Sequence, residues 1–149
     1  MLVSLAIDTI STNRNMKKED QAMLSESEVM GFIPTKDSTR ARAFYEGKLG
    51  LRFISDDQFA LVVESRGTII RIAKVENFAP FPFTILGWRV KNIEEDVRNL
   101  TTREVSFQRF PGLDQNDLGI WTSPDGTKVA WFKDPDGNLL SLSQHLGRT

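Results

Sequence analysis

The sequence predicts an α+β fold built from two tandem modules, each with the element order β-α-β-β-β. The first observation is that the same order of elements, an apolar run, an amphipathic helix and then further apolar runs, occurs twice along the 149 residues. The second is that two helix-capping residues, Asp37 and Asn92, stand at equivalent places in the two halves. The third is that two turn glycines, Gly67 and Gly137, precede the last strand of each half.

The first module is expected over about 29–76. An apolar run at 29–35 predicts a strand. A helix is then expected from the Asp37 N-cap to Gly50, which ends it as a C-cap residue, because apolar residues recur between them at helical spacing. Three strands follow at 51–55, 59–64 and 68–75.

A linker at 77–82 separates the modules, because two prolines in three residues, Pro80 and Pro82, do not fit a central strand. The second module is expected over 83–145. Its helix covers 93–100, behind the Asn92 cap. Its strands are expected at 83–90, 105–110, 119–122, 128–133 and 139–144.

Residues 1–28 form an N-terminal extension in this interpretation, and the folded domain covers 29–149. The extension is rich in Ser, Asn, Lys and Glu and shows no sustained helix or strand period. Its first ten residues lack a basic segment and contain Asp8, which argues against a signal peptide. A cytoplasmic location is therefore expected.

The composition excludes several classes of function. The net charge of −1 offers no electrostatic footprint for nucleic acid. No apolar run approaches the roughly 20 residues that a membrane helix needs. The chain has no cysteine and one histidine, His145, which leaves few ligands for a transition metal. His145 itself is expected to be a surface residue.

Two segments carry a resemblance to a known family. The first is the helix Asp37-Ser38-Thr39-Arg40-Ala41-Arg42-Ala43-Phe44-Tyr45 with its exit Leu49-Gly50-Leu51, and the second is the turn Asp134-Pro135-Asp136-Gly137-Asn138. Together, inside a doubled βαβββ pattern over 29–145, they resemble the vicinal oxygen chelate superfamily. That superfamily includes glyoxalases, bleomycin resistance proteins and extradiol dioxygenases.

The resemblance implies curved mixed sheets around a cavity, with the helices on their outer faces. Metal-binding members place ligands on the first and last strands of each module. Carried over by position from the caps and turn glycines, the four places hold Met30, Arg71, Ile85 and Ser141. These side chains are poor ligands for a divalent cation, or none. We therefore expect neither a metal nor another cofactor.

Strand alternation indicates which other side chains share the cavity face. The candidate ligand-binding set is apolar with two cations and two hydroxyls: Met30, Phe32, Arg71, Ile85, Arg89, Trp131, Ser141 and Ser143. This composition suits a small apolar molecule with an anionic or carbonyl group. The alternatives are that both arginines point to the other face and that Trp131 belongs to the core.

The leading functional hypothesis is a metal-free small-molecule-binding protein of the glyoxalase and bleomycin-resistance type. An enzyme of the same superfamily, such as a lyase, transferase or dioxygenase, is the second hypothesis, and its catalytic residues are not visible in the motifs. A structural module whose cavity is filled by side chains is the third. The resemblance implies that modules pair edge to edge, within one chain or across two, and a homodimer is expected in each case.

Overall fold

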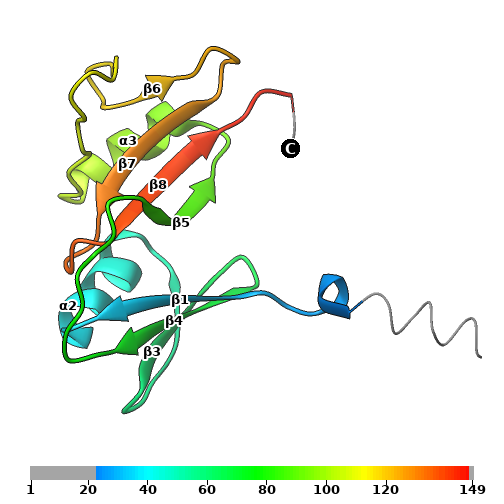
Figure 1. Ribbon diagram of the computed structural model, residues 1–149, viewed down its shortest axis with the longest axis vertical. Coiled ribbons are helices and arrows are strands. Elements are labelled where there is room, and N and C mark those ends of the chain that lie inside the picture. The colour runs from blue at the N-terminus through cyan, green and yellow to red at the C-terminus, as the bar shows by residue number, and fades with distance from the viewer. Residues whose placement is uncertain (1–22, 148–149) are drawn as a thin grey trace, which may run out of the picture.

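The computed structural model describes residues 23–147 and contains two four-stranded mixed sheets (Figure 1). In the N-terminal sheet the spatial order is β1 (Met30–Thr35), β4 (Thr68–Lys74), β3 (Ala60–Ser65) and β2 (Arg52–Asp56). In the C-terminal sheet it is β5 (Thr84–Arg89), β8 (Leu139–Gln144), β7 (Lys128–Lys133) and β6 (Trp121–Thr122).

The two sheets repeat one topology. In each, the first strand of the module pairs in parallel with the last, and the remaining pairs are antiparallel. A helix follows the first strand in both halves, since a parallel pair needs a crossover connection. The prediction of an α+β fold with two tandem βαβββ modules is confirmed. Of the predicted extension, residues 23–28 contain a short 3₁₀ turn, η1 (Met23–Glu26), and the others lie outside the described residues.

The helix of the first module begins where the sequence predicts and continues in a different form. The Asp37 carboxylate accepts a hydrogen bond from the Arg40 amide at 3.1 Å, as an N-cap does. The α-helix α2 (Ser38–Arg42) then passes into a π-helix, η2 (Ala43–Lys48). The Leu49 amide donates to the Phe44 carbonyl at 2.9 Å, a five-residue step. This wider turn ends before Gly50, whose φ of +73° turns the chain into β2.

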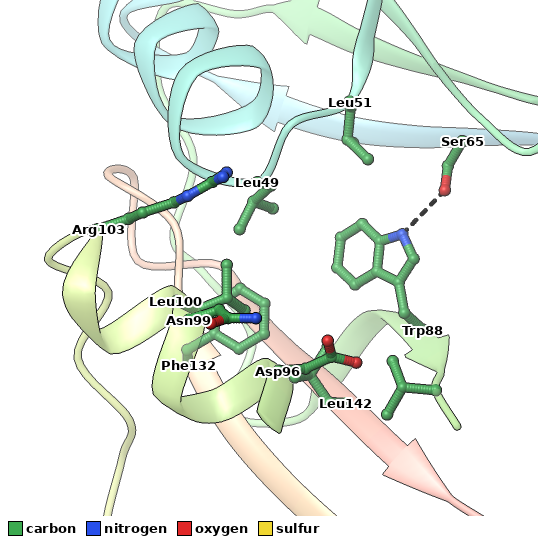
Figure 2. A pocket seen from close by; sticks show the side chains of 11 residues that line it. Leu49, Leu51, Ser65, Trp88, Asp96, Asn99, Leu100, Arg103, Phe132 and Leu142 are labelled. Atoms are coloured by element: carbon green, nitrogen blue, oxygen red, sulfur yellow. Dashed lines mark hydrogen bonds between the residues drawn. The ribbon is translucent and has the colours of Figure 1, made fainter. Parts of the chain in front are cut away.

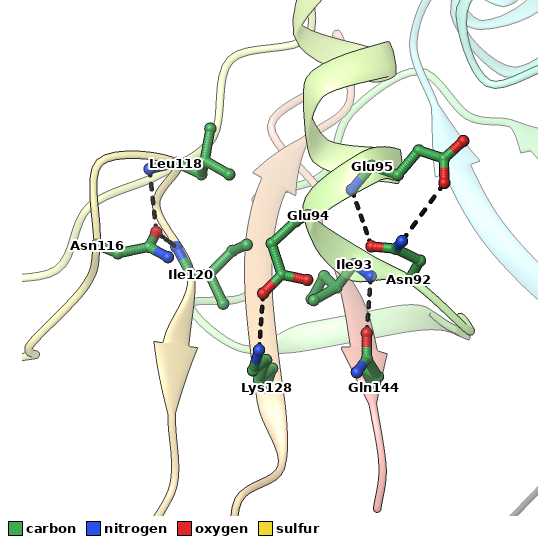
Figure 3. A network of polar contacts seen from close by, with 9 residues as sticks. All are labelled: Asn92, Ile93, Glu94, Glu95, Asn116, Leu118, Ile120, Lys128 and Gln144. Carbon is green, nitrogen blue, oxygen red and sulfur yellow. Dashed lines mark hydrogen bonds and ion pairs between the residues drawn. The ribbon is translucent and has the colours of Figure 1, made fainter.

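The helix of the second module, α3 (Ile93–Thr102), is tied to its sheet by polar contacts at its first turn (Figure 3). The Asn92 side chain accepts from the Glu95 amide at 3.2 Å, so the predicted cap is confirmed. The Gln144 side chain of β8 accepts from the Ile93 amide at 2.8 Å. Lys128 of β7 forms a 2.7 Å ion pair with Glu94.

Two strand predictions in the second module are wrong. The expected strand 105–110 contributes a single bridge, between Phe107 and Phe132. The expected strand 119–122 is reduced to β6. The cause is a loop held by the Gln115 side chain, which accepts from the Phe110 amide at 2.8 Å and donates to the Gly119 carbonyl at 2.9 Å. These hydrogen bonds occupy the backbone groups through which longer strands would pair with their neighbours.

The helix-facing sides of both sheets contribute to a continuous hydrophobic core. It includes Ile33, Ile70 and Ile72 from the N-terminal sheet and Phe132, Leu140 and Leu142 from the C-terminal sheet. Phe44 of η2 contacts Phe132 across the two modules, with ring centroids 6.3 Å apart. Because both sheets turn these sides toward one core, their other sides face outward. Among the described residues, no helix combines the length and apolar character that crossing a bilayer requires.

The turn after β7 joins the modules. The buried Asp134 carboxylate accepts from the Tyr45 hydroxyl at 2.6 Å and from the Asn138 amide and side chain, both at 2.9 Å. The Asn138 side chain also donates to the Pro34 carbonyl at 3.0 Å, and Asp136 accepts from the Thr35 hydroxyl. The two segments that carry the family resemblance therefore bind each other across the module boundary.

Electrostatics at this junction keep Tyr45 protonated. Burial raises the pKa of the Tyr45 hydroxyl far above its ordinary value, and the neighbouring Asp134 charge raises it further. Burial also raises the pKa of Asp134, and the hydrogen bonds from Tyr45 and Asn138 oppose that rise. Tyr45 therefore remains a hydrogen-bond donor to a carboxylate that is buried away from water.

Candidate functional site

The outward side of the N-terminal sheet, here called the N-terminal open face, is apolar with one central cation. Backbone pairing places Phe32 of β1, Arg71 of β4 and Val62 of β3 side by side. Their neighbours along each strand point into the core, so these three share the outward side. The face consists of Met30, Phe32, Val62, Glu64, Ile69, Arg71 and Ala73.

The apolar side chains of β1 on this face are largely uncovered. Phe32 is 65% exposed and Met30 is 45% exposed. Apolar side chains exposed side by side, unlike single exposed ones, point to a surface that binds another molecule. Glu64 supplies a carboxylate at the edge of the face, where it accepts from the Gly67 amide at 3.2 Å and lies 3.6 Å from Arg52.

The outward side of the C-terminal sheet, the C-terminal open face, is more polar and has an aromatic end. Pairing places Gly87, Ser141 and Trp131 in one row and Arg89, Ser143 and Val129 in the next. A Cβ at position 87 would lie 2.7 Å from the Ser141 hydroxyl, so glycine leaves room above that serine.

Two aromatic residues that the sequence did not assign to the site extend this face. The rings of Phe110 and Trp131 form a T-shaped contact with centroids 5.4 Å apart, and the centroid of Trp121 lies 6.3 Å from that of Trp131. His145 also belongs here, since its Nε2 lies 3.0 Å from the Ser143 hydroxyl. His145 is exposed, as expected. His145 was not among the predicted site residues, although strand alternation continued past Ser143 would have placed position 145 on this side.

The structure therefore separates the eight candidate residues into two groups. Met30, Phe32 and Arg71 lie on the N-terminal open face. Four others lie on the C-terminal open face, namely Arg89, Trp131, Ser141 and Ser143. Ile85 belongs to neither group, because a register shift between Thr84 and Leu86 interrupts the alternation and Ile85 packs against the core. The position opposite Ser141 is taken by Gly87.

The side chains at the family's metal positions do not fit a divalent cation. Arg71 has Phe32 as its partner on β1, and Ser141 has Gly87 as its partner on β5. None of these four, nor Met30 and Ile85 at the other two positions carried over from the family, offers a carboxylate, imidazole or thiolate, and the guanidinium repels a cation. Over residues 23–147, no three His, Cys, Asp or Glu side chains gather as a metal site would require.

The fold is similar to several solved structures. A member of the glyoxalase, bleomycin resistance protein and dioxygenase superfamily from Sphaerobacter thermophilus is 22% identical, with a TM-score of 0.62 over 79% of this chain and 96% of that one. TnmS3, an antibiotic binding protein from Streptomyces sp. CB03234, is 22% identical, with a TM-score of 0.59 over 80% and 95%.

Lactoylglutathione lyase from Agrobacterium tumefaciens is 11% identical, with a TM-score of 0.64 over 83% of this chain and 98% of that one. At these identities the similarity shows the fold alone. The similar structures include both a binding protein and an enzyme. No curated protein sequence matches this chain significantly.

A family model extends the comparison to sequence. The model of the Glyoxalase/Bleomycin resistance protein/Dioxygenase superfamily matches residues 27–142. This range includes both segments that carry the resemblance and both sheets, except for the last two residues of β8. The paired βαβββ modules, the capped helices and the Asp134 turn agree with that match. The chain belongs to the glyoxalase, bleomycin resistance protein and dioxygenase superfamily.

Proposed function

We propose that this protein binds a small organic molecule without a metal, on the open faces of its two sheets. The observation that carries the proposal is the composition of these faces. Arg71 and Ser141 stand at places where metal-binding relatives keep ligands, and Ser143 and the aromatic rings of Phe32 and Trp131 lie beside them on the same faces. The expected cytoplasmic location is part of the same proposal.

The ligand that fits best has an apolar body and an anionic or carbonyl group. Arg71 supplies a guanidinium among apolar neighbours, where it can hold a carboxylate or phosphate through two hydrogen bonds. Ser141 and Ser143 supply hydroxyls to a carbonyl oxygen. Trp131 offers a ring face for stacking beside them. TnmS3, with a similar fold, is an antibiotic binding protein, which is compatible with this use of the fold.

A second copy of the chain completes the site in this proposal. The two open faces point away from one another, so one chain does not close a cavity between them. In the described part of the chain, β1 and β5 each have one edge without a paired strand. A homodimer in which an open face of one chain meets an open face of the other would cover both the exposed aromatics and these edges.

Replacing the central cation tests the ligand assignment. We expect Arg71→Ala to weaken binding of 4-phenylbutyrate or phenyl phosphate about 10- to 100-fold, since a hydrogen bond to a charged group is worth roughly 1.5–3 kcal/mol. Affinities are measured by thermal shift and calorimetry in the presence of a chelator. Arg98→Ala, an exposed cation on α3, is the matched control. Equal affinities for the two variants would refute the role of Arg71.

One observation favours an enzyme of the same superfamily as the second candidate. The Ser143 hydroxyl and His145 Nε2, 3.0 Å apart, are the types of group that form a nucleophile and its general base. Over the described residues, no carboxylate bonds to the other nitrogen of the ring, so the pair lacks an orienting group. Hydrolysis of p-nitrophenyl acetate that disappears in His145→Ala would support this candidate, and an unchanged background rate would exclude it.

A further inference from the structure

A pocket of about 390 Å³ lies between the two modules, on the helix side of both sheets and away from both open faces (Figure 2). Its volume is within the range of small-molecule sites. The first module contributes Leu49, Leu51 and Ser65. The second module contributes the remaining walls, formed by Trp88, Val90, Asp96, Asn99, Leu100, Arg103, Phe132 and Leu142. We call it the junction pocket.

The helix α3 and its C-cap residue Arg103 supply both charged groups of the junction pocket. Asp96, Leu100 and Arg103 follow one another at intervals of four and three residues, which places them on one side of a helix. Asn99 lies beside Leu100 on the same side. Asp96 and Arg103 are two turns apart, so about 10 Å of helix separates the carboxylate end of the pocket from the guanidinium end.

The carboxylate end has no partner among the residues that the structure describes. Between residues 23 and 147, the Asp96 side chain forms neither a hydrogen bond nor an ion pair. Burial raises the pKa of Asp96, and the charge of Glu95 raises it further. A partly buried, unpaired carboxylate beside apolar side chains is costly, and a cation bound there would remove that cost.

The opposite wall is aromatic and held in place. Trp88 Nε1 donates to the Ser65 hydroxyl at 3.1 Å, which fixes the indole between the two modules (Figure 2). The indole is stacked on Phe132 at a centroid distance of 6.3 Å. Such a ring accepts an apolar body, and its face also attracts a cation.

The guanidinium end is already engaged. Arg103 donates to the Lys48 carbonyl at 3.1 Å, a bond that links α3 to the end of η2. This cation disfavours a positive group at its own end of the pocket, so a ligand would place its charge at the Asp96 end.

We propose that the junction pocket is a second small-molecule site, and that it takes an amine with an apolar body. The ammonium group pairs with Asp96, the Asn99 side chain hydrogen-bonds beside it, and the body lies between Leu100 and Trp88. This inference does not rest on the proposed function of the open faces, because the two sites share no residue.

The test is an NMR titration of the ¹⁵N-labelled full-length protein with 3-phenylpropylamine, read on the Trp88 indole N–H. That resonance is identified by its loss in Trp88→Phe. We expect saturable shifts of the Trp88 signal, and at least tenfold weaker binding in Asp96→Asn. Glu95→Gln removes the neighbouring exposed carboxylate, which does not line the pocket, and is the matched control; only a small change in affinity is expected, because Glu95 acts on Asp96 through its charge alone. Arg71→Ala should also leave this titration unchanged.

Three results would overturn the proposal. The first is an affinity for neutral 3-phenylpropan-1-ol equal to that for the amine, since the carboxylate would then contribute nothing. The second is an equal effect of Asp96→Asn and Glu95→Gln. The third is the absence of any shift at the Trp88 indole up to millimolar amine, including the case in which only the Trp121 and Trp131 signals move.

Discussion

Asp134→Ala is expected to lower the free energy of unfolding by about 3–5 kcal/mol, because several hydrogen-bond donors lose one buried acceptor at once. Asp134 is 5% exposed, and its carboxylate accepts from Tyr45, Asn138 and the Asp136 amide. Its removal leaves these donors without partners, and each buried orphan costs roughly 1–3 kcal/mol. Urea denaturation measures the change, and the melting temperature should fall by about 10 °C.

The second turn of similar chemistry provides the control. Asp125, between Pro124 and Gly126, accepts from the Thr127 amide and the Ser123 hydroxyl but is exposed. Asp125→Ala should therefore cost much less than Asp134→Ala. Tyr45→Phe, which removes only one donor to Asp134, should cost about 1–3 kcal/mol. Similar losses for Asp125→Ala and Asp134→Ala would show that the contact between the modules does not stabilise the fold.

Phe32→Lys is expected to convert the proposed homodimer into a monomer. Burying a phenylalanine is worth roughly 1.5–3 kcal/mol, and a two-fold symmetric interface buries the residue of each chain, so that this contribution occurs twice. Lysine in place of this ring would also bring two charges toward an apolar interface. The dimer dissociation constant should rise about 100-fold or more. Sedimentation velocity measures the mass of two chains for the unmodified protein and of one chain for the variant.

Thr39→Lys, an exposed position on α2 rather than on a sheet face, is the matched control and should remain dimeric. A wild-type protein that sediments as a monomer at micromolar concentration would contradict the two-chain site. A Phe32→Lys protein that stays dimeric would place the interface elsewhere and leave the N-terminal open face to be explained.

The elements that the sequence predicted well are those governed by local chemistry. Asp37 and Asn92 cap their helices because an acceptor side chain before an amphipathic run satisfies free amides wherever it occurs. Strand alternation likewise placed Ser141 and Ser143 on one side of β8 and Leu140 in the core.

The features that the sequence did not reveal depend on contacts between distant residues. Tyr45 and Asp134 are 89 positions apart, and no local pattern indicates that one turn would bind the other module. The bulge at Ile85 shifts the register by one residue, whereas a prediction from strand alternation assumes that the register is regular. Gln115, which shortens β6, looks in sequence like an ordinary loop residue.

The junction pocket shows the same limit. Asp96 and Arg103 are visible in the sequence as charges near the two ends of a helix, where they complement its dipole. That they line a pocket depends on Leu49 and Leu51 of the other module closing the space above them. Only the packing of the two modules determines this.

Native mass spectrometry of the protein, purified without chelator or added metal, tests the central claim most directly. We expect the mass of two chains with no metal ion, and a further mass equal to 4-phenylbutyrate when that compound is added. A near-stoichiometric adduct of zinc, nickel, manganese or iron would contradict a metal-free site, and the assignment of Arg71 and Ser141 to ligand binding would fail with it.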